Sequence, residues 1–162
     1  MLWGKLSHLN KKTMACCLSV KGYSFAVLNG TRVLHTVKRD FTEKSDAILQ
    51  ALANDVEQLH LAGQACSLVL LPGQYQLVLL DTIESVPDAE MAKALRWRLK
   101  GLVDYPLNDI AMDMFRVPPH GVAGQRKKAF IAVTLMSGLK SMVQILESAY
   151  LKVDSAVSYT HL

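Results

Sequence analysis

The hydrophobic pattern of this 162-residue chain changes its period several times along the sequence, and this constrains the fold more than any other feature. The first part alternates apolar and polar residues as half-buried strands do, and Asn29-Gly30 is a strong hairpin signal. From Ser45 to Ala62, apolar residues recur every three or four positions, as in a helix, and Gly63 ends the pattern. The three strands expected before this helix, at residues 13–20, 23–28 and 33–41, form a meander.

The rest of the chain continues to change between the two periods. The order of predicted elements is βββαββαββαβ, which indicates a mixed α/β fold with no long linker. We expect the strands on either side of Pro72-Gly73 to pair with each other across that turn. Two compact lobes, divided near residues 41–46, fit this order. The later elements are strands at 65–71, 74–80, 110–117, 128–136 and from 153, and helices that begin at Pro87 and Ser137.

The composition is that of an ordinary folded protein, with 51% hydrophobic and 20% charged residues. No apolar run reaches the roughly 20 residues that a membrane-spanning helix needs, and no signal peptide is evident, so we expect a cytoplasmic chain. Cys16, Cys17 and Cys66 are an odd number of cysteines inside strand-like segments, which favours buried free thiols. The histidines are scattered singly, so we expect no metal site.

Positive charge is concentrated near the N-terminus. Residues 1–44 hold eight Lys or Arg against two Asp or Glu, whereas the rest of the chain is slightly acidic. In the leader, residues 1–12, the apolar side chains fall close to one face of a short predicted helix, with basic residues around them, which resembles an interfacial helix for anionic lipid. A helix that packs on a neighbour, or a frayed end, explains the same pattern. The leader residues predicted to contact a membrane are Trp3, Lys5, Leu6, Lys11 and Lys12.

The helix expected from Pro87 has two different faces. Pro87 suits a first helical position, and the acidic residues after it suit the positive end of the helix dipole. One stripe is apolar and is predicted to be buried, another face is basic, and Trp97 falls cleanly on neither. The apolar stripe consists of Met91, Leu95, Leu99 and Leu102, and the basic face consists of Lys93, Arg96 and Lys100. The chain leaves the helix through Gly101 and the turn Asp104-Tyr105-Pro106.

No motif in the sequence requires an enzyme. The chain has neither the Gly-x-Ser-x-Gly turn of serine hydrolases nor a glycine-rich phosphate loop. Asp104, Asp109 and Asp113 are candidates for a general acid–base set, but turn positions and a solvated strand face explain them better. We therefore predict no catalytic residues.

The run from Pro87 to Phe115 resembles the PilM-type proteins of type IV pilus assembly, including those of MSHA-type pilus machines. The matching residues are Pro87, Glu90, Met91, Ala94, Leu95, Arg96, Trp97, Tyr105, Pro106, Leu107 and Asp113. The resemblance implies a partial actin-like ATPase fold, in which residues 13–44 are the first strands of an actin-like lobe and residues 45–162 an inserted α+β (SHS2-type) subdomain with a return strand. Because the sequence stops in a strand-like segment, we expect the chain either to be a fragment or to end in a strand that pairs with a segment outside it.

The same resemblance bears on nucleotide binding. In nucleotide-binding members, the first hairpin supplies an aspartate for metal and small residues, including glycine, for phosphate. Laid on that pattern, this chain has Cys17 at the aspartate position and Ser19 at the first glycine position. A thiol does not replace a carboxylate as a magnesium ligand, since hard cations need anionic oxygen. We therefore predict no cofactor and no enzymatic activity.

The resulting hypothesis is a non-catalytic scaffold at the cytoplasmic side of the inner membrane, in a pilus assembly machine. It docks the short cytoplasmic tail of an inner-membrane protein and contacts the assembly ATPase, and nucleic acid is not expected as a partner. A buried Trp97 and a solvated basic face are the alternatives at the predicted site. A degenerate actin-like ATPase that needs a second lobe, and a different binding module that shares only this helix, are the alternative functions. The predicted docking residues are Lys93, Arg96, Trp97, Lys100 and Tyr105.

Overall fold

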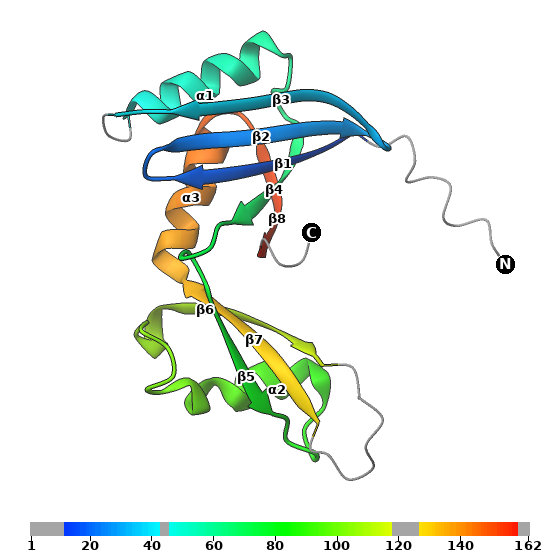
Figure 1. Ribbon diagram of the computed structural model, residues 1–162, viewed down its shortest axis with the longest axis vertical. Coiled ribbons are helices and arrows are strands. Elements are labelled where there is room, and N and C mark those ends of the chain that lie inside the picture. The colour runs from blue at the N-terminus through cyan, green and yellow to red at the C-terminus, as the bar shows by residue number, and fades with distance from the viewer. Residues whose placement is uncertain (1–11, 43–45, 118–126, 159–162) are drawn as a thin grey trace, which may run out of the picture. The chain divides into compact units, whose positions relative to one another are not determined.

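The computed structural model describes residues 12–42, 46–117 and 127–158, and its elements follow the predicted order (Figure 1). Within these ranges the strands are β1 (Lys12–Ser19), β2 (Gly22–Asn29), β3 (Arg32–Asp40), β4 (Ala65–Leu70), β5 (Gln76–Asp81), β6 (Ile110–Arg116), β7 (Lys128–Leu135) and β8 (Lys152–Ser158). The helices in the same ranges are α1 (Asp46–Gln58), α2 (Asp88–Leu95) and α3 (Met136–Ser148), together with the short 3₁₀ helices η1 (Arg96–Leu99) and η2 (Leu107–Asp109). The predicted mixed α/β class is confirmed.

The chain divides into two compact units, of which the first comprises residues 1–71 and 141–162 and the second residues 72–140. The order of elements in the sequence predicts a boundary near residues 41–46, after the meander. Helix α1 and strand β4 lie in the first unit because β4 pairs in parallel with β1, with Cys16 opposite Leu68. Two parallel neighbours need a crossover connection between them, and α1 supplies it.

The first unit contains a five-stranded sheet in the order β3-β2-β1-β4-β8. Strands β1, β2 and β3 pair in antiparallel fashion, which confirms the predicted meander, while β4 and β8 are parallel to β1. One face of the sheet is buried where alternate apolar residues of β1 and β2 lie opposite one another, and α1 adds Ile48, Leu52 and Val56 to the buried apolar residues of this unit. The buried residues of β1 and β2 are Met14, Cys16, Leu18, Tyr23, Phe25 and Val27.

A buried carboxylate joins α1 to two strands of this sheet. Asp55 accepts a hydrogen bond of 2.6 Å from the Tyr23 hydroxyl and two from Arg39, from Nε at 3.0 Å and Nη2 at 2.7 Å. The hydrogen bonds from Arg39 hold the pKa of Asp55 below its ordinary value, and burial raises the pKa of Tyr23. This network fixes α1 on the sheet.

Helices α1 and α3 end in the same way. His60 and Tyr150 follow them in the left-handed conformation, with φ of 53° and 65°, and each is followed by a buried leucine. Leu61 N–H donates to the Val56 carbonyl at 2.8 Å, and Leu151 N–H donates to the Leu146 carbonyl at 3.1 Å, the hydrogen-bond pattern of a Schellman motif. The equivalent ends direct β4 and β8 into the sheet side by side.

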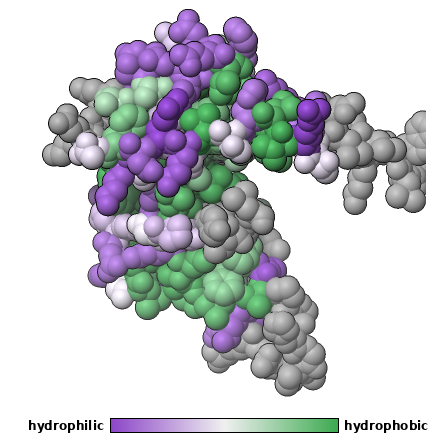
Figure 2. Space-filling view, turned by 45° about the horizontal axis from the view of Figure 1, so that its top comes forward, coloured by the Kyte–Doolittle hydropathy of each residue, from purple (hydrophilic) through white to green (hydrophobic). Residues whose placement is uncertain are grey.

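The second unit contains a three-stranded antiparallel sheet in the order β5-β7-β6. Helix α2 and η1 pack on one face of this sheet, where Leu95 and Leu99 are fully buried. The opposite face carries the partly exposed Leu77 and Leu79, and Phe115 stacks there on Phe130 with ring centroids 5.2 Å apart. Figure 2 shows apolar side chains gathered over much of the second unit on the face in view.

The expected pairing of the strands on either side of Pro72-Gly73 is wrong. Strand β4 pairs with β1 and β8 in the first unit, and β5 pairs with β7 in the second. The turn itself is present, with Gly73 at φ 90°, but the chain passes through it from one unit to the other. The consecutive buried residues Leu68, Val69 and Leu70 are typical of a strand inside a parallel sheet, which is covered on both faces.

Candidate functional site

The α-helix that follows Pro87 is shorter than the sequence suggested. Pro87 is the N-cap, with φ −60° and ψ 152°, rather than the first helical residue, and α2 tightens into η1 at Arg96. The prediction that Met91, Leu95 and Leu99 are buried is confirmed. The prediction for Leu102 is wrong, because the chain has already left the helix at Gly101, whose φ of 78° breaks the helical repeat.

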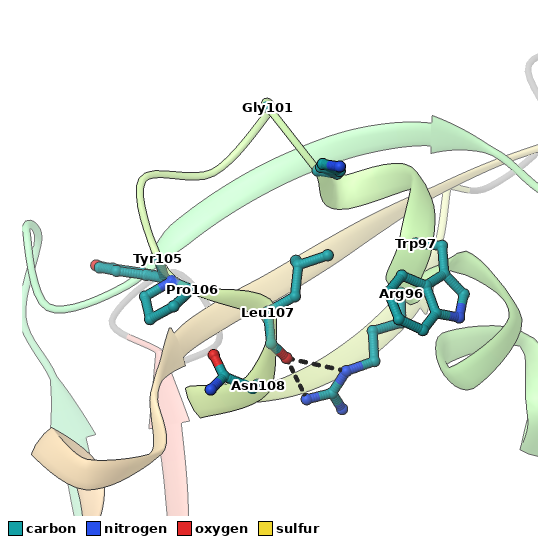
Figure 3. A pocket seen from close by; sticks show the side chains of 8 residues that line it. Arg96, Trp97, Gly101, Tyr105, Pro106, Leu107 and Asn108 are labelled. Atoms are coloured by element: carbon teal, nitrogen blue, oxygen red, sulfur yellow. Dashed lines mark hydrogen bonds between the residues drawn. The ribbon is translucent and has the colours of Figure 1, made fainter.

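Arg96 holds the segment that follows the helix, residues 101–109, which we call the exit loop. Its Nε and Nη2 donate to the carbonyl oxygen of Leu107 at 3.2 and 2.6 Å (Figure 3). Nη2 also donates to the carbonyl oxygen of Ile110, at 3.5 Å. Hydrogen bonds from a charged donor are stronger than neutral ones. Arg96 therefore positions the exit loop, and part of its guanidinium is already committed within the chain.

A second side chain fixes the middle of the exit loop. Gln76, at the start of β5, donates from Nε2 to the Asp104 carboxylate at 2.6 Å and accepts from the Asp104 backbone N–H at 3.1 Å. Asp104 is therefore a turn residue whose carboxylate and backbone N–H are both bound by Gln76. This agrees with the turn position expected from the sequence.

The end of the exit loop is tied to α3. The Asp109 carboxylate accepts hydrogen bonds from the backbone N–H of Ser137 at 3.1 Å and from its hydroxyl at 2.5 Å. The helix begins at Met136, one residue before the start at Ser137 that the sequence predicted, so Ser137 lies in its first turn and is not its N-cap. The cap acceptor comes instead from a residue distant in sequence, which local patterns do not reveal.

The exit loop and η1 enclose an open pocket of about 570 Å³ within the second unit (Figure 3). Four of the five predicted docking residues line it, whereas Lys93 is exposed on α2 and does not. Trp97 is 77% exposed, so this side chain is not part of the core. Leu107 and Asn108 also line the pocket directly after the Tyr-Pro turn, and they were not among the predicted docking residues. The pocket is lined by Arg96, Trp97, Lys100, Gly101, Tyr105, Pro106, Leu107 and Asn108.

The predicted membrane-contact residues fall mostly outside the described residues, where Trp3, Lys5, Leu6 and Lys11 lie. Lys12 is described and does not belong to a leader helix. It is the first residue of β1, paired with Asn29, and its carbonyl oxygen accepts a hydrogen bond of 3.2 Å from Gln64. No helix in the described part of the chain is long and apolar enough to cross a membrane.

Cys17 lies on β1, on the face of the sheet opposite to the buried Cys16. Burial raises the pKa of the Cys17 thiol, so it is protonated at neutral pH and is a poor ligand for a hard cation. Across residues 12–42, 46–117 and 127–158, no group of three or more His, Cys, Asp or Glu side chains is placed to hold a metal ion.

Comparison with known proteins gives matches to solved structures alone. No protein-family model matches the chain, and no curated protein matches its sequence significantly. The cytoplasmic domain of EpsL, an inner-membrane component of the type II secretion system of Vibrio cholerae, superposes with a TM-score of 0.68 and 14% identity, over 91% of this chain and 57% of that one. A chain of the PilM–PilN type IV pilus biogenesis complex superposes with a TM-score of 0.67 and 15% identity, over 93% of this chain and 48% of that one.

The chain thus spans about half the length of the solved structures that it matches. At these identities the similarity concerns the fold, and the predicted partial actin-like ATPase fold is confirmed. Its fold corresponds to about half of the fold of these two solved structures.

Proposed function

We propose that this chain is a non-catalytic scaffold of a type IV pilus machine at the cytoplasmic face of the inner membrane. Its fold is that of EpsL, which belongs to an inner-membrane secretion assembly, and of PilM, which was solved in complex with PilN. In this proposal it docks the cytoplasmic segment of a PilN-like inner-membrane partner and contacts the assembly ATPase. The match from Pro87 to Phe115 favours an MSHA-type machine, in which the chain is the counterpart of the biogenesis protein MshI.

The observation that carries the proposal is that Trp97 is exposed beside a pocket, and that the exit loop on the other side of this pocket is held by hydrogen bonds. A tryptophan that is 77% exposed leaves a large apolar surface in water, and burial of such a surface by a partner contributes about 2–4 kcal/mol. The bonds from Arg96 and Gln76 preorganise the exit loop, which lowers the entropy that docking costs.

The proposal that the chain has no ATPase activity rests on the first hairpin. A protonated Cys17 stands at the position where the nucleotide-binding proteins that this chain resembles carry a metal-binding aspartate. Calorimetric titration of Mg-ATP into the chain is expected to give no binding heat, and saturable binding would contradict this part of the proposal.

The docking proposal is tested by measuring how a synthetic peptide of the PilN-like cytoplasmic segment binds to the immobilised chain. Trp97→Ala is expected to weaken binding at least tenfold, or about 1.4 kcal/mol, because it removes the apolar anchor. Its exposure means that the variant keeps the fold, which circular dichroism checks.

Tyr150→Ala is the matched control, since Tyr150 is also an exposed aromatic residue, at 67%, but lies in the first unit. This variant is expected to bind with unchanged affinity. Equal affinities of the wild type and a folded Trp97→Ala variant would show that the partner docks elsewhere.

A further inference from the structure

The pocket beside Trp97 has the chemistry of a site for a negatively charged ligand. Arg96 and Lys100 both line it, and none of its lining residues is acidic. The nearest carboxylates in sequence, those of Asp104 and Asp109, are engaged by Gln76 and by Ser137. The positive charge at the pocket is therefore not neutralised by its own walls.

The polar groups of the pocket that are free to bind a ligand are mainly hydrogen-bond donors. Within the described part of the chain, the side chains of Lys100, Tyr105 and Asn108 make no hydrogen bond or ion pair. Arg96 binds the exit loop through Nε and Nη2, and its Nη1 makes no hydrogen bond to a described residue. Ammonium, guanidinium and hydroxyl groups are satisfied by an acceptor such as a carboxylate.

The apolar part of the site narrows the class of ligand. Trp97 lines the pocket together with Arg96 and Lys100, so an apolar side chain on the indole places its neighbours near both cations. A nucleic acid needs a longer row of basic residues than two, of which one already holds the exit loop. A short peptide that carries carboxylates beside apolar residues fits both parts of the pocket.

We propose that the pocket binds an acidic, extended peptide segment, with its carboxylates at Lys100 and Arg96 and an apolar side chain on Trp97. The inference rests on the proposed docking function and adds the chemistry of the segment that docks. Charge complementarity of this kind sets which partner is accepted and how fast it binds.

The test uses the capped heptapeptide Asp-Leu-Glu-Leu-Asp-Leu-Glu and its counterpart with lysine at every acidic position. The chain has two tryptophans, so the Trp3→Phe variant leaves Trp97 as the single tryptophan reporter. The acidic peptide is expected to shift the Trp97 emission to shorter wavelength with saturation, and less strongly as salt rises. The lysine peptide is expected to give no shift.

Two charge reversals locate the binding site. In the Trp3→Phe background, Lys100→Glu is expected to weaken binding of the acidic peptide at least about tenfold, because the charge lies in the pocket. Lys93→Glu makes the same change of charge on α2 outside the pocket and is expected to alter affinity less than about threefold. Equal effects of the two reversals, or equal binding of the two peptides, would overturn the proposal.

Further binding measurements distinguish a failure of this inference from a failure of the proposed docking function. A larger Trp97 shift with a deoxythymidine decamer or with phosphatidylglycerol vesicles than with the acidic peptide would overturn the inference in favour of nucleic acid or lipid. If the PilN-like segment needs Trp97 but the acidic peptide gives no shift, docking stands and the acidic chemistry is wrong. If the acidic peptide binds through Lys100 but the PilN-like segment does not bind, the pocket stands and the proposed partner is wrong.

Discussion

At the residue scale, single polar side chains decide how the elements are joined. Arg96, which is a predicted docking cation, also holds the exit loop through the Leu107 carbonyl. Asp55 reaches from α1 to Tyr23 and Arg39, so one carboxylate fixes a helix against two strands. Neither role follows from the residue type, because each depends on a partner that folding brings close.

The Asp55 network predicts how stability depends on pH. Asp55→Ala is expected to lower the free energy of unfolding by about 1–3 kcal/mol at pH 7, because the Tyr23 hydroxyl loses its acceptor. Because folding lowers the pKa of Asp55, its ionisation stabilises the fold above the unfolded pKa of about 3.9 and this contribution is lost as pH falls through the folded value. Urea unfolding should therefore show a smaller difference between variant and wild type at pH 3 than at pH 7.

Glu147→Gln is the control for this measurement, since Glu147 is exposed on α3. It is expected to change stability by less than about 0.5 kcal/mol. A difference between Asp55→Ala and wild type that is the same at both pH values would contradict the assigned role of the carboxylate.

At the element scale, the helix ends carry conformations that suit glycine but hold other residues. Tyr150 lies at φ 65° after α3, and His60 at φ 53° after α1. A bulky side chain in the left-handed region is strained, whereas glycine adopts it freely. The left-handed backbone at His60 and Tyr150 therefore lowers the stability of the fold relative to glycine at the same positions.

We predict that Tyr150→Gly raises the free energy of unfolding by up to about 1 kcal/mol, because it relieves the left-handed backbone. Ser148→Gly is the matched control, since Ser148 lies in the last turn of α3, where glycine costs up to about 1 kcal/mol. Thermal unfolding of the two variants should shift the midpoint in opposite directions. Destabilisation by both would contradict the strain at Tyr150.

At the scale of the whole molecule, the chain builds two separate cores. Leu52 is fully buried in the first unit, and Leu95 is fully buried in the second, against Ile110 and Ile131. The chain passes between the units twice, after Leu71 and after Lys140. Units that have separate cores can unfold separately, each with its own free energy of unfolding.

Leu95→Ala leaves a cavity in the core of the second unit and is expected to lower its free energy of unfolding by about 2–5 kcal/mol. We predict that it speeds amide hydrogen exchange in β5, β6 and β7 far more than in β1 and β2. Leu52→Ala is expected to produce the reverse pattern. Faster exchange of all these strands by the same factor in both variants would show that the two units unfold as one.

Much of the element order followed from local pattern, because alternation and helical spacing repeat over short stretches of sequence. The meander of β1, β2 and β3 and the buried stripe from Met91 to Leu99 belong to this class. The pairing of β4 did not follow, because its partner β1 lies far away in sequence and the turn at Pro72-Gly73 suggested a nearer one. Leu102 was misplaced because the spacing alone does not show where the helix ends.

The candidate site divides in the same way. Sequence spacing is enough to predict that Arg96, Trp97, Lys100 and Tyr105 lie close together, since they flank one helix end and one turn. The folded structure shows in addition that Trp97 faces solvent, that Arg96 donates to the Leu107 carbonyl through Nε and Nη2, and that Lys93 lies outside the pocket. The physical reason is that spacing sets which residues share a neighbourhood, whereas burial and hydrogen bonding depend on which distant elements pack against it.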